Sequence, residues 1–232
     1  MSYTLTNLVS DSYLCYRGKL SSIPAAGSEK YSRIVAIANR KQREWAQDSN
    51  IDWPSRYEIR QLGSLTSGTQ EYDLDDDILR PSDYVVLTSP TSQVQYIGII
   101  KPQQISRYLK GAYVFGFNPK QLTFIQTIDS SYTGYKLSLP CFTMPADMVN
   151  PTDVISVDDP QYLVYAVAAE LARNDYAKEE QYPNLIGQAN DLYAKMIADA
   201  EANSFLQPNG VVNAMPQSSA LDYNNFSGYG VI

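Results

Sequence analysis

The spacing of apolar residues changes twice along this chain, and this change constrains the fold more than any other feature. In residues 3–48 and again in residues 158–203, apolar side chains recur every three or four positions, which is the period of an amphipathic helix. In residues 57–142 the period falls to two, as in β-strands. Two helical regions that flank strands must pack together across them. The pattern therefore predicts an α+β fold, a helical core with an inserted antiparallel β module.

The second helical region has a clear start and a clear interruption. Asp158-Asp159-Pro160 provides a carboxylate to cap free backbone N–H groups, followed by a proline suited to the first turn. Gln181-Tyr182-Pro183 interrupts the pattern, and a second amphipathic helix follows. Both helices carry an apolar stripe that needs a partner surface, so we expect this pair to form the core onto which the other parts pack.

The first helical region contains a short helix that ends near Gly18 and a longer one, capped by Ser28, that runs to about Asp48. Residues 28–48 hold five basic and three acidic side chains, a net charge of +2 in a chain whose net charge is −7. A basic face of this kind is either solvated or in contact with an acidic neighbouring subunit. The candidate interface residues on it are Arg40, Lys41 and Arg43.

Five apolar or alternating runs predict strands in the middle of the chain: 84–88, 94–100, 112–117, 122–128 and 135–142. Residues 135–139 alternate between apolar and polar, which predicts one buried and one exposed face. We therefore divide the chain into N-terminal core helices (1–56), an inserted β module (57–150), C-terminal core helices (151–203) and a terminal segment (204–232).

The sequence lacks the residues that most enzymes use. It has no histidine, which removes the commonest general base and metal ligand and excludes a Ser-His-Asp or Cys-His arrangement within the chain. It has no glycine-rich phosphate loop and no nucleophile elbow. The 25 acidic residues allow a hydrolytic carboxylate pair, but nothing singles out two of them. We expect a protein without catalytic activity, cofactor or bound metal.

One acidic loop begins like a calcium-binding loop and then departs from that pattern. Ile78 stands where the sharp turn needs glycine, and Tyr84 stands where a bidentate glutamate belongs. We therefore predict an exposed acidic loop with no metal ion, formed by Asp73, Asp75, Asp76 and Asp77.

The composition argues against membranes and nucleic acid as binding partners and favours other proteins. No apolar run approaches the roughly 20 residues of a membrane helix, so we expect no membrane partner. The net charge of −7 argues against a surface that clamps nucleic acid. Nineteen tyrosines against six phenylalanines favour half-hydrated contact surfaces, as at protein interfaces.

Residues 203–232 differ from the rest of the chain, since they contain no Lys or Arg and their only charge is Asp222. A polar segment of this composition cannot fold alone. Apolar side chains are nevertheless spaced along it like anchors, which predicts an extended arm that docks on a partner subunit; the alternative is a tail that folds back on its own subunit. The anchor residues are Phe205, Leu221, Tyr223, Phe226, Tyr229 and Ile232.

The order of these parts resembles a known family. Residues 37–45 leading to Asp52-Trp53-Pro54 resemble the junction between a helix and a Trp-Pro pair in the head–tail adaptor proteins of tailed bacteriophages. After the β insertion, residues 135–139 lead through Met144-Pro145-Ala146-Asp147 to the helix start at 158–160, and residues 162–173 with the restart at 182–185 look like the closing helices of that family. The resemblance covers residues 3–202.

The resemblance implies a structural neck protein of the virion, assembled in the host cytoplasm. Proteins of this family form a ring, usually of twelve copies, below the portal, where they extend the DNA channel and connect the capsid to the tail. The implied partners are other copies of the chain, the portal, a tail or nozzle protein, and double-stranded DNA that passes without specific binding. The acidic loop would then face the channel or solvent, and the arm would dock on the portal or on a neighbouring copy.

Simple physical arguments agree with this interpretation. A cyclic ring needs two unlike faces on each subunit, and a basic helix in an acidic chain provides them. A channel of acidic subunits would also repel DNA phosphates over about a Debye length. The alternative is a β-rich virion fibre or baseplate module that binds a glycan or another tail protein through its tyrosines. A weaker alternative is a hydrolase with an unrecognised carboxylate pair.

Overall fold

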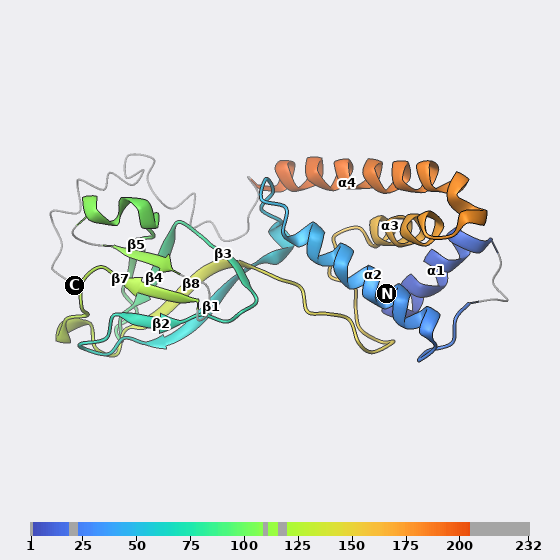
Figure 1. The fold of residues 1–232 in the computed structure, drawn as a ribbon. Coiled ribbons are helices and arrows are strands. Elements are labelled where there is room, and N and C mark those ends of the chain that lie inside the picture. Colours follow the sequence, from blue (N-terminus) through green and yellow to red (C-terminus); the bar gives the residue numbers. More distant parts are fainter. Residues whose placement is uncertain (1, 19–22, 109–110, 116–119, 205–232) are drawn as a thin grey trace. The chain divides into compact units, whose positions relative to one another are not determined.

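The computed structural model describes residues 2–18, 23–108, 111–115 and 120–204 (Figure 1). These residues form two compact units, a helical unit of residues 2–56 and 144–204 and a β unit of residues 57–143. The α+β fold expected from the sequence is thus confirmed. Residues 144–150, predicted to belong to the β module, belong to the helical unit.

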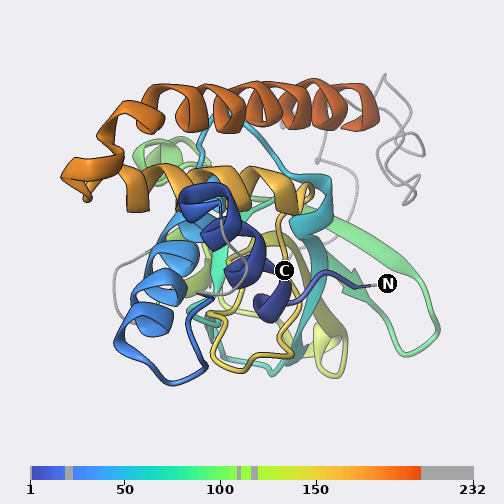
Figure 2. The same ribbon diagram turned by 90° about the vertical axis from the view of Figure 1, so that its right-hand side faces the viewer.

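The helical unit contains four α-helices, and α3 lies at its centre. The helices are α1 (Leu5–Arg17), α2 (Glu29–Ala46), α3 (Pro160–Arg173) and α4 (Tyr182–Ser204). The short 3-10 helix η2 (Pro54–Arg56) follows α2, and η5 (Tyr176–Gln181) joins α3 to α4. α3 packs against α1, α2 and α4, and Figure 2 shows it beneath α4. Most of its side chains are buried, so α3 supplies the core of this unit.

Short polar signals set the ends of these helices. The side chain of Ser28 accepts a hydrogen bond from the backbone N–H of Tyr31, and that of Asp159 accepts one from Gln161. Gly18 ends α1 in the left-handed region at a φ of 70°, which costs glycine little because it has no Cβ. No helix in the described residues is long and apolar enough to cross a membrane.

Two buried amides join the two sequence halves of the helical unit. Asn39 donates to the backbone oxygen of Met148 at 2.9 Å and accepts from its N–H at 2.8 Å. Gln42 donates to the carbonyl of Ala146 at 3.0 Å and accepts from the N–H of Ser156 at 3.3 Å. These bonds satisfy backbone groups that have no partner in a helix or sheet, and they hold residues 146–156 against α2.

The β unit contains two antiparallel sheets. In the larger sheet the order is β1 (Tyr57–Ser64), β8 (Lys136–Thr143), β4 (Tyr84–Thr88) and β5 (Val94–Gly98), and β3 (Ile78–Pro81) also pairs with β8. The smaller sheet has the order β2 (Glu71–Asp73), β7 (Gln121–Phe124) and β6 (Ala112–Phe115). The 3-10 helices η3 (Pro102–Arg107) and η4 (Ser130–Tyr132) lie in the connections. The core between the strands includes Leu87, Leu122, Phe124, Leu137 and Leu139.

β8 corrects one expectation from the sequence. The alternation of residues 135–139 predicts an exposed face, but every residue of β8 after Lys136 is buried. The reason is that β8 is central: β1 pairs with one of its edges, and β3 and β4 pair with the other. The buried hydroxyl of Ser138 donates to the side-chain oxygen of Gln61 at 3.0 Å, so its burial leaves no polar group unsatisfied.

Candidate functional site

An aromatic cluster lies where α2, the Trp-Pro pair and the closing helices meet. The ring of Trp53 is 1% exposed and packs against Trp45 and Tyr193, with centroid distances of 5.0 and 5.9 Å. The indole N–H of Trp53 donates to the carbonyl of Trp45 at 2.8 Å. Tyr193 packs on Tyr162 of α3 at 5.4 Å and donates its hydroxyl to Asp48. Residues from both halves of the chain thus share one packed contact, in which the two tryptophans are buried and the two tyrosines are half-buried.

The cations predicted on α2 bind carboxylates of their own chain. Arg40 pairs with Glu44 at 3.6 Å and with Glu170 of α3 at 3.4 Å. Lys41 pairs with the same two residues at 2.8 and 3.7 Å. The side chain of Arg40 remains 50% exposed, whereas that of Lys41 is 18% exposed. Lys41 therefore joins α2 to α3, and Arg40 keeps a surface that a partner can reach.

Arg43 is paired in a different way. Its guanidinium donates to both carboxylate oxygens of Asp147, at 3.0 and 2.9 Å, and its side chain is 44% exposed. Two other cations of α2, Lys30 and Arg33, are exposed and form no side-chain ion pair within the part of the chain that the structure describes. Unpaired positive charge among the described residues of α2 therefore lies on Lys30 and Arg33, whereas the three predicted interface residues each pair with carboxylates of the same chain.

A groove of about 520 Å³ follows this side of α2. One side of the groove is formed by α2, through Ser32, Val35 and Ala36. The other side is formed by residues 147–149, from the segment between β8 and α3. Val149 is 72% exposed. The lining of the groove is therefore mixed: small and apolar side chains lie beside Tyr31 and Asn39, with the Arg43–Asp147 pair toward the C-terminal end of α2.

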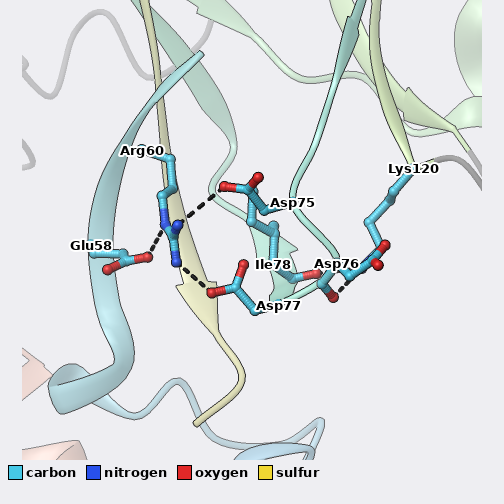
Figure 3. Close-up of polar contacts among 7 residues, drawn as sticks. All are labelled: Glu58, Arg60, Asp75, Asp76, Asp77, Ile78 and Lys120. Carbon is cyan, nitrogen blue, oxygen red and sulfur yellow. Dashed lines mark hydrogen bonds and ion pairs between the residues drawn. The ribbon is translucent and has the colours of Figure 1, made fainter. Parts of the chain in front are cut away.

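The acidic loop is organised around one arginine of the β unit (Figure 3). Arg60, on β1, pairs with Asp75 at 3.1 Å and also with Glu58 and Asp77. The hydrogen bond to Glu58 and the charges of Asp77 and Glu58 raise the pKa of Arg60. Three carboxylates therefore converge on a single guanidinium, which holds the loop against β1.

A second cation holds the other side of this loop. Lys120 donates to the backbone oxygens of Asp76 and Ile78, and Asp73 accepts a hydrogen bond from Gln121 at 2.9 Å. Asp73, Asp75 and Asp76 are exposed, and Asp77 is half-buried. Across the described ranges, no group of three or more Cys, Asp or Glu side chains is placed to hold a metal ion.

Sequence reasoning missed the intrachain partners of these cations. The i,i+4 spacing of Arg40 and Glu44 is a local signal, but Asp147 and Glu170 lie more than 100 positions from their partners. The predicted anchors of the arm lie outside the described residues: Phe205, Leu221, Tyr223, Phe226, Tyr229 and Ile232.

Comparison with known protein families gives no match for this chain, and comparison with curated proteins also gives none.

Proposed function

We propose that this chain is a structural head–tail adaptor of a tailed bacteriophage. In this role it forms a ring, of about twelve copies, below the portal, extends the DNA channel and connects the capsid to the tail or nozzle protein. It works by assembly, without catalysis, cofactor or metal. Its location is the neck of the virion, which it reaches after assembly in the host cytoplasm.

The observation that carries this proposal is the aromatic cluster of the helical unit. The resemblance to the adaptor family rests on two separated segments, 37–54 and 144–185. Trp45 and Trp53 come from the first segment, and Tyr162 comes from the second. Tyr193, which contacts both Trp53 and Tyr162, joins them. The segments that resemble the family thus form one core, with the strands inserted between them as the resemblance implies.

The charge of the chain fits a channel through which DNA passes without binding. The net charge is −7, and Arg60 and Lys120 neutralise only part of the acidic loop. Acidic walls repel phosphates at short range, so DNA moves past them without being retained at specific positions.

The arm is the second element of the proposal. We propose that residues 204–232 dock on the portal or on a neighbouring copy through their aromatic anchors. Truncation after Asn203 should leave the melting temperature of the monomer almost unchanged and prevent its incorporation into rings or heads. A truncated chain that assembles normally, or that no longer folds, would contradict this role of the arm.

The experiment that tests the proposed function mixes the purified chain with the portal protein of the same phage. We expect electron microscopy to show a ring of this chain stacked coaxially on the portal. A tail fibre or baseplate protein of the same phage, offered in place of the portal, is the matched control and should give no such stack. Binding to the control protein but not to the portal would contradict the proposal. Turnover of a glycan or peptide that a single carboxylate substitution abolishes would contradict it as well.

A further inference from the structure

The turn between α3 and α4 carries an exposed aromatic side chain on backbone that neighbouring side chains hold in place. Tyr176, the first residue of η5, is 95% exposed. The preceding residue, Asp175, caps the N–H of Ala177 at 3.1 Å, accepts a hydrogen bond from Tyr16 and pairs with Arg17 at 3.2 Å. A large aromatic ring on a backbone that is already ordered loses little conformational entropy on binding, which is typical of interface anchors.

The α2 groove offers a matching surface on a different part of the same unit. Ser32 and Ala36 are exposed and small, so they leave room for an incoming ring. Val35 and the exposed Val149 provide apolar contacts beside that space. The groove volume of about 520 Å³ is ample for a tyrosine side chain.

The charges around the two features are opposite. Glu179 and Glu180 follow Tyr176 on η5, and both are exposed without an ion pair to any described residue, so they outweigh Lys178, the half-buried cation of this helix. Lys30 and Arg33 are exposed cations of α2 without an ion pair to any described residue, and Arg33 lies one position from Ser32, whereas the charge of Arg43 at the groove is balanced by its pair with Asp147. An acidic turn and a basic groove edge favour a defined docking orientation.

We infer that the α3–α4 turn of one copy docks in the α2 groove of the next copy, with Tyr176 as the anchor. The occupant of the groove is thus a second copy of this chain. Because the anchor and the groove are different surfaces, the contact is heterologous, and repeating it generates a closed ring or an open filament. This inference rests on the proposed ring and names the interface that builds it.

The test uses one variant on each side of the contact, in the full chain. Tyr176→Ala removes the anchor, and Ala36→Trp fills the groove from an exposed helix position. Both should weaken self-association at least tenfold, as expected for loss of a central aromatic anchor, and leave the melting temperature of the monomer unchanged. Tyr176→Phe keeps the ring, and Ala194→Trp adds the same bulk to an exposed position of α4. Both controls should assemble like the wild type.

Mixing the two defective variants gives the most specific result. The Ala36→Trp chain retains its anchor and the Tyr176→Ala chain retains its groove, so one intact contact forms between them. Sedimentation analysis should therefore show 1:1 dimers and no larger species. If either variant forms normal rings by itself, this interface is wrong and the proposed function still stands. If the wild-type chain forms no rings, either alone or with the portal protein, the proposed function itself is wrong. A mixture that stays monomeric would also overturn the inference.

Discussion

The two units of this chain are held together in different ways. The helical unit collects residues that are far apart in sequence, so Asn39 bonds to Met148 and Trp53 packs on Tyr193. The β unit is one continuous segment, residues 57–143, with a core of its own. This difference indicates that the helical unit depends on contacts between both halves of the chain. The β unit depends mainly on its own strands, so substitutions should affect the two units separately.

Trp53→Ala should give the largest difference between the two units in the stability that each loses. This change removes a side chain that is 1% exposed, together with the hydrogen bond to Trp45, and should cost the helical unit about 3–5 kcal/mol. Hydrogen exchange should speed up in α3 and α4 and stay slow in β4 and β8. Equal loss of protection in all four elements would show that the units unfold as one.

Asn39→Ala tests the join between the two sequence halves. It leaves the N–H and the carbonyl of Met148 buried without partners, which should destabilise the helical unit by about 2 kcal/mol. Asn174→Ala is the matched control, since that amide is exposed and bonds only within its own helix turn. Denaturant titration followed by helical circular dichroism would measure both. Similar losses for the two variants would contradict the role assigned to Asn39.

Arg60→Ala tests how the β unit holds its acidic loop. Removal of the guanidinium leaves Glu58, Asp75 and Asp77 close together without a counter-charge, and the β unit should lose about 1 kcal/mol, more at low salt. Arg107→Ala, at an exposed position of η3, should have little effect. Exchange rates in β1 and β3 would report the change. A loss that does not depend on salt would show that Arg60 acts through packing alone.

The smallest effect concerns the base of the α3–α4 turn. Burial and the hydrogen bond to Asp175 raise the pKa of Tyr16 from 10.0 to about 12. A raised pKa in the folded state stabilises the protein fully below pH 10, and this contribution is lost as the pH rises through about 12. The stability difference between wild type and Tyr16→Phe should therefore be constant from neutral pH to pH 10 and then shrink. A constant difference up to pH 12 would contradict this coupling.

The sequence predicted the helices well because their signals are local. Caps at Ser28 and Asp159, the glycine at position 18 and the interruption near Pro183 each lie within a few residues of the helix end that they set. The predicted strand at 84–88 matches β4, and the other four predicted runs begin or end within a few residues of β5, β6, β7 and β8.

The strands β1, β2 and β3 lie outside the predicted runs because charged side chains leave them with few apolar residues. In β1, Glu58 and Arg60 alternate with Tyr57 and Ile59, so the strand has few apolar side chains, yet the mutual pairing of the two charged residues and the pairing of β1 with β8 stabilise it. The burial of Ser138 is equally invisible in the sequence, because it depends on strands on both sides of β8. Such tertiary pairing overrides the local signal.

The candidate surfaces were predicted only in part. The sequence located basic side chains on α2, but the structure pairs Arg40, Lys41 and Arg43 with distant carboxylates and leaves Lys30 and Arg33 without such a partner among the described residues. Neither the groove nor the exposure of Tyr176 follows from periodicity, since both depend on how separated segments pack.

Native mass spectrometry of the purified full chain, alone and with the portal protein, tests the central claim most directly. We expect one closed assembly of fixed copy number at all protein concentrations at which the chain assembles. Twelve chains of 26.0 kDa would give a particle of about 312 kDa. A chain that stays at 26.0 kDa under both conditions, or a ladder of sizes that grows with concentration, would contradict a closed ring.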